Sequence, residues 1–322
     1  MRAICASSVS RPLGTGLSRP FGWILGFFFT IGLCHLALAS KFTFNWPVPS
    51  HFTVEEVVSA KGNTVEYSYD FELNKTNDGF VLECNKVQLT SYNGQKLSEK
   101  NQTDLEPIAR MSQYPPLQID SDGSFIEVLQ GEAAVERAQQ GLEKTFPNLP
   151  NQTKVGLKAF YQNEAGKKAL NQIYGNIWAL WVEAWTDLDL KEGESMSTNL
   201  DLSTGEDEPL PTKETWTDAG WVKGKTNLVC LKFKSITHGK DLVATIKPYT
   251  DAIATNASFK PADPLPSGIS FERSVIMEIH TDPNTLQPQY AREAMTIRTK
   301  PPGEDEIIDT QTHIYTFTWD KP

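Results

Sequence analysis

The stretch Val65-Glu66-Tyr67-Ser68-Tyr69-Asp70-Phe71 decides the fold class. Its odd positions are apolar or aromatic and its even positions are polar. This period of two is typical of a β-strand with one face on a core and the other in water. The turn-forming segment Asn74–Gly79 follows, and Phe80–Leu89 then has the pattern of a second, hairpin strand. The stretch therefore predicts an antiparallel sheet.

Further extended segments lie on both sides of a helical middle region. Asn227–Phe233 alternates in the same way, and Asp282-Pro283-Asn284-Thr285 supplies a turn between two long strands. The final strand places four large rings on one face, those of His313, Tyr315, Phe317 and Trp319. The strands predicted beyond the first hairpin are Pro116–Ile119, Ser124–Leu129, Asn227–Phe233, Leu242–Lys247, Ile269–His280, Arg292–Thr299 and this final strand.

The middle of the chain predicts three helices. Glu132–Phe146 is rich in good helix formers, Asn151 is a suitable cap for a helix over Lys154–Tyr161, and Ala165–Trp185 has a wide apolar face. The acidic, turn-rich segment Leu188–Lys213 then predicts a long connection. Strands, helices and more strands in this order indicate an α+β fold, with an antiparallel sheet packed on one side by a helical insert.

Four segments carry a resemblance: "GSFIEVLQG" at 123–131, the Trp-rich helix, "TNLVCLKFKSI" at 226–236 and "IHTDPNTLQPQY" at 279–290. They resemble uncharacterised exported bacterial proteins that are similar in layout to lipoprotein-carrier proteins. The resemblance implies a curved antiparallel sheet, a half barrel, that wraps around helices and holds an acyl chain. It transfers no catalytic residue.

Residues 1–39 predict a cleavable signal peptide. Three arginines precede an apolar run from Phe21 to Ala39, and the small residues Ala37 and Ala39 suit cleavage before Ser40. The alternatives are an uncleaved anchor through residues 21–39, since about 19 apolar residues can span a bilayer, and lipidation of Cys34. We therefore expect an exported protein, periplasmic or extracellular, whose residues 40–322 form one α+β domain.

Removal of residues 1–39 leaves 27 basic and 40 acidic residues, a net charge of −13. This acidity argues against nucleic acid as a partner, because binding phosphate needs positive charge. Four N-x-Ser/Thr sequences are glycan acceptors only in a eukaryotic secretory pathway: Asn74, Asn101, Asn151 and Asn256.

Cys84 and Cys230 are the cysteines that remain after signal cleavage. An exported compartment permits a disulfide between them, and two separate thiols are the alternative. The histidines His51, His238, His280 and His313 are far apart in sequence, so no metal site is predicted from spacing. The acidic cluster Glu206–Glu208 lacks the spacing of a calcium loop and is better explained as a solvated loop.

No catalytic motif or cofactor-binding motif is present in the chain, and no cofactor is predicted. Neither a G-x-S-x-G elbow nor an H-E-x-x-H, C-x-x-C or Gly-rich phosphate-binding sequence occurs. The most distinctive feature is instead aromatic: Trp178, Trp181 and Trp185 lie along one side of a helix. These rings either fill the hollow of the sheet as core residues or line an apolar cavity between sheet and helix.

Three functions follow from these alternatives. The first is an exported, non-enzymatic cell-envelope protein that binds an apolar ligand, such as an acyl chain or lipid, beside the tryptophans. The second is a structural or protein-interaction domain with a filled core. The third is a hydrolase, which requires carboxylates such as Glu183 or Asp187 to meet inside a cleft.

Overall fold

The computed structural model describes residues 42–145, 164–202, 210–240, 242 and 268–320. Several sequence-based predictions lie outside these residues and stay predictions. They are the signal peptide at 1–39 with Cys34, the helix over Lys154–Tyr161, the sequences at Asn151 and Asn256, the acidic cluster Glu206–Glu208 and most of the strand Leu242–Lys247.

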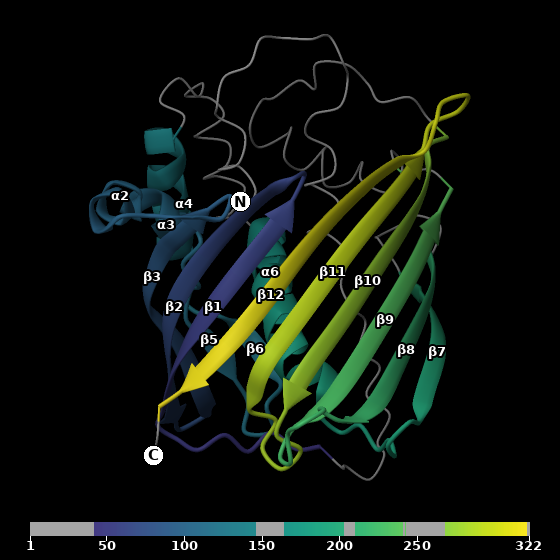
Figure 1. Cartoon of the computed structure of the whole chain (residues 1–322), viewed down its shortest axis with the longest axis horizontal. Coiled ribbons are helices and arrows are strands. Elements are labelled where there is room, and N and C mark those ends of the chain that lie inside the picture. Colours follow the sequence, from purple (N-terminus) through teal and green to yellow (C-terminus); the bar gives the residue numbers. More distant parts are fainter. Residues whose placement is uncertain (1–41, 146–163, 203–209, 241, 243–267, 321–322) are drawn as a thin grey trace.

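A single large antiparallel sheet of 12 strands dominates the described part of the chain (Figure 1). The strands are β1 (Ser50–Ala60), β2 (Asn63–Thr76), β3 (Gly79–Tyr92), β4 (Gln95–Lys96), β5 (Leu117–Ile119), β6 (Phe125–Val128), β7 (Ser195–Leu202), β8 (Leu210–Trp221), β9 (Val229–Gly239), β10 (Ser270–Thr281), β11 (Pro288–Lys300) and β12 (Ile307–Trp319). Their order across the sheet is β6-β5-β3-β2-β1-β12-β11-β10-β9-β8-β7, with β4 paired to β3. The sheet is open, with β6 and β7 at its ends.

The first and last strands join the two halves of the sheet. β1 pairs with β2 on one side and with β12 on the other, so Val54 faces Tyr69 and Phe317. Strands from before and after the helices therefore share one sheet. The predicted hairpin of Val65–Phe71 with Phe80–Leu89 is confirmed, since Tyr67 pairs with Leu89 in the β2–β3 register.

The α-helices are α2 (Glu99–Asp104), α3 (Glu106–Met111), α4 (Gly131–Thr145) and α6 (Glu164–Trp181), followed by the 3₁₀ helix η2 (Glu183–Trp185). Helix α6 lies on one side of the sheet, and the short helices α2 and α3 contact β3 (Figure 1). In Figure 1, α6 lies behind β11 and β12, and it contacts β6, β10 and β11. The α+β layout predicted from the sequence is confirmed at this level.

Two local predictions were wrong. The segment Leu188–Lys213 is not only a connection, because it contains β7 and the start of β8. β7 does alternate, with Met196 and Leu200 half-buried between exposed polar residues, but it stands directly beside an acidic, turn-rich segment. As the last strand of the sheet it pairs through its backbone and through hydroxyl contacts such as Ser195 Oγ to Thr217 Oγ1 at 2.7 Å. The Trp-rich α-helix ends at Trp181, and its last residues form η2 instead.

The apolar side chains form two separate clusters. The main cluster lies between α6 and the inner face of the sheet and includes the three tryptophans of the helix region. The second cluster lies near the start of β8, the start of β10 and the end of β11. It consists of Leu210, Leu242, Ile269, Phe271 and Ile297, with Leu200 and Met295 packed against it. Met295 contacts both clusters.

Candidate functional site

The inner face of the sheet is the candidate site, and the strand register places its residues in rows. One row runs Trp216, Phe233, Met277, Glu293, His313 and Val58 from β8 to β1. The next runs Glu214, Ser235, Val275, Met295 and Gln311 from β8 to β12. Each row of the inner face therefore combines apolar side chains, such as Phe233, with polar ones, such as Glu293.

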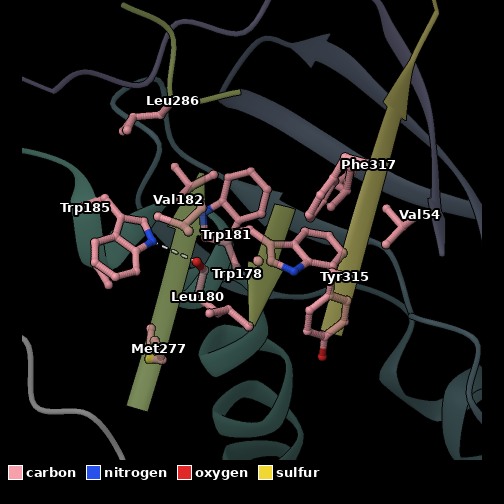
Figure 2. Packing of buried hydrophobic residues seen from close by; sticks show 14 of the residues in the cluster. Val54, Trp178, Leu180, Trp181, Val182, Trp185, Met277, Leu286, Tyr315 and Phe317 are labelled. Carbon is pink, nitrogen blue, oxygen red and sulfur yellow. Dashed lines mark hydrogen bonds between the residues drawn. The ribbon is translucent and has the colours of Figure 1, made fainter. Parts of the chain in front are cut away.

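The three tryptophans lie deep in the main cluster, each at most 1% exposed. Trp178 Nε1 donates a hydrogen bond to the carbonyl of Gly123 at 2.7 Å, and Trp185 Nε1 donates to the carbonyl of Leu180 at 2.7 Å. Figure 2 shows the indoles gathered with Met277, Tyr315 and Phe317 of the sheet, and its dashed line marks the Trp185 bond. Two of the three indoles are therefore held by both packing and hydrogen bonding.

Trp181 is surrounded by other rings. Its centroid lies 5.5 Å from Phe71, 5.7 Å from Tyr315 and 5.2 Å from Phe317, all in edge-on arrangements. Tyr114 lies 5.8 Å away on another side. Its indole Nε1 is buried without a hydrogen-bond partner. The surroundings of Trp181 are those of a core residue, and they favour packing over cavity lining for this ring.

Between the two apolar clusters lies a layer of buried polar side chains, here called the polar layer: Thr212, Glu214, Ser235, Thr237 and Arg273. All five lie on the inner face of β8, β9 and β10. Thr212 Oγ1 and Thr237 Oγ1 are 2.9 Å apart and share a hydrogen bond. Buried polar groups are normally satisfied in this way, so those that are not require an explanation.

Glu214 is the member of the polar layer whose carboxyl group is buried without hydrogen bonds. It is 1% exposed, and neither of its carboxylate oxygens has a hydrogen-bond partner. Desolvation raises the pKa of Glu214 to about 7, because burial disfavours the charged form. The side chain is therefore divided between a neutral acid and a carboxylate near neutral pH.

Arg273 brings a positive charge into the same layer. Burial lowers the pKa of Arg273 to about 10, and Glu293 on the neighbouring strand opposes this shift. The guanidinium still carries its charge at neutral pH. The polar layer thus holds one cation and one acid of variable charge within an otherwise apolar face.

A second polar group joins the strands at the centre of the sheet. Glu56, fully buried on β1, accepts a hydrogen bond from Tyr69 Oη at 2.7 Å, and its other oxygen lies 2.8 Å from His313 Nδ1. Gln311 Nε2 approaches His313 Nε2 at 2.5 Å. Both carboxylate oxygens of Glu56 have a partner, so we assign this network a structural role.

The structure does not bring the other predicted residues together at this site. Glu183 is half-buried in η2, whereas Asp187 is exposed. His51 and His238 lie on the outer face, 3.8 Å from Glu72 and 3.7 Å from Glu272 respectively. Of the four histidines, His313 alone lies on the inner face.

Of the two alternatives for Cys84 and Cys230, a disulfide or two separate thiols, the structure shows separate thiols, Cys84 buried and Cys230 half-buried. Cys84 lies on β3 and Cys230 on β9, and five strands separate these two. Six strand spacings of about 4.8 Å amount to roughly 29 Å measured across the sheet, whereas a disulfide requires Cα atoms within about 7 Å. Neither cysteine forms a disulfide in the structure.

Sequence reasoning missed Glu56, Glu214 and Arg273, although a signal for each was present. Arg273 is in phase with Phe271 and Val275. Glu56 is in phase with Val54, and Glu214 is in phase with Trp216. A charged residue on the apolar phase of a strand must be buried wherever that face is covered. Only the pairing of strands distant in sequence shows which of these charges lie near one another.

Comparisons with known proteins gave structural likenesses and no match by sequence. No family model matches the chain, and no curated protein matches it. A structure of lipovitellin, described as showing lipid–protein interactions, aligns at a TM-score of 0.37 and 9% identity over 84% of this chain. The chain spans 25% of that lipovitellin chain.

A porin-like protein from Bacteroides uniformis aligns at a TM-score of 0.20 and 11% identity, over 86% of this chain and 100% of that one. Both TM-scores lie below 0.5, so neither likeness assigns a fold or a function. Separately, no helix within the described ranges is long and apolar enough to cross a membrane.

Proposed function

We propose that the protein is an exported, non-enzymatic cell-envelope protein that binds a lipid-like molecule on the inner face of a curved, half-barrel sheet. The observation that carries this proposal is Glu214, a buried carboxyl group whose two oxygens have no partner. Leaving a buried polar group unsatisfied costs about 1–3 kcal/mol, and more for a charged group. A hydrogen-bond donor on a ligand would remove that cost.

The surroundings of Glu214 define the kind of ligand. Apolar clusters flank the polar layer on both sides, with Trp216 and Phe233 on one side and Phe271 and Ile297 on the other. This arrangement of apolar and polar surface matches a molecule that has an apolar chain and a polar group that donates hydrogen bonds. The polar group would bind at Glu214, while the three tryptophans would support the site from the core.

Lipids with different head groups distinguish this assignment. A monoacylglycerol hydroxyl or a phosphatidylethanolamine ammonium offers a donor to Glu214, whereas a fatty-acid carboxylate at pH 8 offers none. Lipids extracted from the purified protein should be identified by mass spectrometry, and each class then added in a thermal-shift assay. We expect donor-bearing lipids to raise the melting temperature more than fatty acids do.

A matched pair of variants tests the site itself. Glu214→Leu removes the carboxyl group while keeping an apolar, buried side chain, so it is expected to fold. It should weaken binding of the donor-bearing lipid by about 10-fold or more, as expected for loss of a hydrogen bond to a charged group. Glu55→Leu, at an exposed position on the outer face of β1, should not affect binding. Equal lipid affinity in both variants would contradict the assignment.

The second candidate function is a structural or interaction protein with a filled core. The close packing of rings around Trp181 favours it. Absence of any co-purified lipid, together with no thermal shift for any lipid class, would leave this function in first place.

A further inference from the structure

The outer face of the sheet brings together a cysteine, a glutamate and a histidine. Cys230 on β9 and His280 on β10 are direct register partners, and Glu278 lies two residues before His280 on the same face. The ligating atoms of these three side chains, a sulfur, a carboxylate oxygen and an imidazole nitrogen, all lie within 4.8 Å of one another. This face is opposite to the one that carries the polar layer.

We propose that Cys230, Glu278 and His280 form a binding site for a divalent metal ion of the zinc type. Thiolate, imidazole and carboxylate are the three side-chain ligands that Zn²⁺ accepts. Three protein ligands leave a fourth tetrahedral position, and the half-buried setting of all three residues leaves it accessible to water.

The geometry needs only side-chain adjustment. In a tetrahedral zinc site, neighbouring ligand atoms are about 3.5 Å apart, given metal–ligand bonds of about 2.0–2.3 Å. His280 Nε2 already lies 3.0 Å from Glu278 Oε1. The β9–β10 ladder holds Cys230 and His280 as direct partners, and the Cys230 sulfur lies within 4.8 Å of the other two ligand atoms.

Neighbouring groups orient the ligands. Lys232 Nζ lies 3.2 Å from Glu278 Oε2, so it holds one carboxylate oxygen while Oε1 faces His280. The ring of Tyr290 lies 4.8 Å from the imidazole of His280 and fixes its plane. Such supporting contacts commonly set ligand orientation at metal sites.

The metal has to displace a proton from sulfur. Burial, with Glu278 adding to it, raises the pKa of the Cys230 thiol to about 11. Formation of the metal–sulfur bond therefore releases one proton to solvent, and the bound cation then lies beside the Glu278 carboxylate. No redox change is involved.

Titration of the purified protein with Co²⁺, and competition by Zn²⁺, tests the site directly. We expect one Co²⁺ per chain with a thiolate-to-cobalt charge-transfer band, which Zn²⁺ abolishes. Cys230→Ser should lose the band, and Cys84→Ala, at the other cysteine of the described chain, should retain it. His280→Ala should weaken Co²⁺ binding by at least about 10-fold, because loss of a residue that only supports a metal ligand already costs about that much in metal affinity. His51→Ala, at an exposed histidine, should match the wild type.

Circular dichroism of each variant separates loss of a ligand from loss of the fold. A folded wild type without the charge-transfer band would overturn the proposal, as would a band that persists in Cys230→Ser. Because the site lies on the outer face, Glu214→Leu should leave Co²⁺ binding unchanged, so this proposal and the lipid-binding proposal fail independently.

Discussion

Glu56 Oε1 lies 2.8 Å from Nδ1 of His313, although the two residues are 257 positions apart in the chain. Glu56 belongs to the first strand and His313 to the last, and β1 pairs with β12 along nine register positions, Phe52 with Trp319 to Ala60 with Gln311. The side-chain bond crosses this junction on the buried face, with Tyr69 of β2 bound to the other oxygen of Glu56. Three neighbouring strands thus meet at one carboxylate.

Removal of this carboxylate should destabilise the fold strongly. Glu56→Ala leaves the partners on Tyr69 and His313 buried without their acceptor, and we expect a loss of roughly 3 kcal/mol in the free energy of unfolding. Tyr69→Phe removes only one hydrogen bond and should cost about 1 kcal/mol. Urea denaturation measures both values. Glu55→Ala, at an exposed neighbour, is the control, and an equal effect of the two alanine variants would refute the structural role.

Trp181→Ala tests whether the central indole is a core residue. Its ring contacts rings of Phe71, Tyr315 and Phe317, so truncation should cost about 3–5 kcal/mol. Trp221, which is 53% exposed, should lose less than about 1 kcal/mol on the same change. Thermal or urea unfolding distinguishes them. If Trp181→Ala lowers the free energy of unfolding only slightly, and added ligand does not change this result, the ring is not packed as the structure describes.

Gly123 should resist substitution more than Gly94 does. Its φ is +92°, and an added Cβ would lie 2.5 Å from the Cβ of Phe44, so Gly123→Ala meets both backbone strain and a steric clash. We expect a loss of roughly 2–3 kcal/mol, because Phe44 packs in the main cluster and Trp178 bonds to the Gly123 carbonyl. Gly94, with φ +75° and no atom near an added Cβ, is the matched control and should lose about 1 kcal/mol in an identical denaturation experiment.

The pH dependence of stability should report Glu214. Its folded-state pKa of about 7 lies above the ordinary value of 4.5, so the folded state binds more protons between these limits. Stability from this group is therefore fully present below about pH 4.5 and is lost as pH rises through about 7, by about 3 kcal/mol. Glu214→Gln should unfold at a higher temperature than the wild type at pH 8, with a smaller difference at pH 5.

The comparison at two pH values makes this result specific. Glu55→Gln should shift the melting temperature equally at both, since Glu55 is exposed. A Glu214→Gln protein with the pH profile of the wild type would show that Glu214 does not titrate near neutral pH.

The sequence by itself determined the local structure of the strands. Alternation over Val65–Phe71 and the turn before Phe80 were sufficient for the β2–β3 hairpin, and the turn at Asp282–Thr285 was sufficient for β10 and β11. These features depend on neighbours within a few residues, which is the range over which side-chain period and turn residues act. Helix α6 was likewise visible from its apolar spacing.

Only the tertiary structure decided which distant strands pair and what their inner faces hold together. The β1–β12 junction, the separation of Cys84 from Cys230, and the assembly of Glu214 with Arg273 in one buried layer all depend on the register of strands far apart in sequence. Alternation shows that Arg273 shares a face with Val275, but not which residues of β9 or β11 lie beside it. Packing of the whole core selects that register, because a slip of one residue would move every buried side chain of a strand to the wrong face.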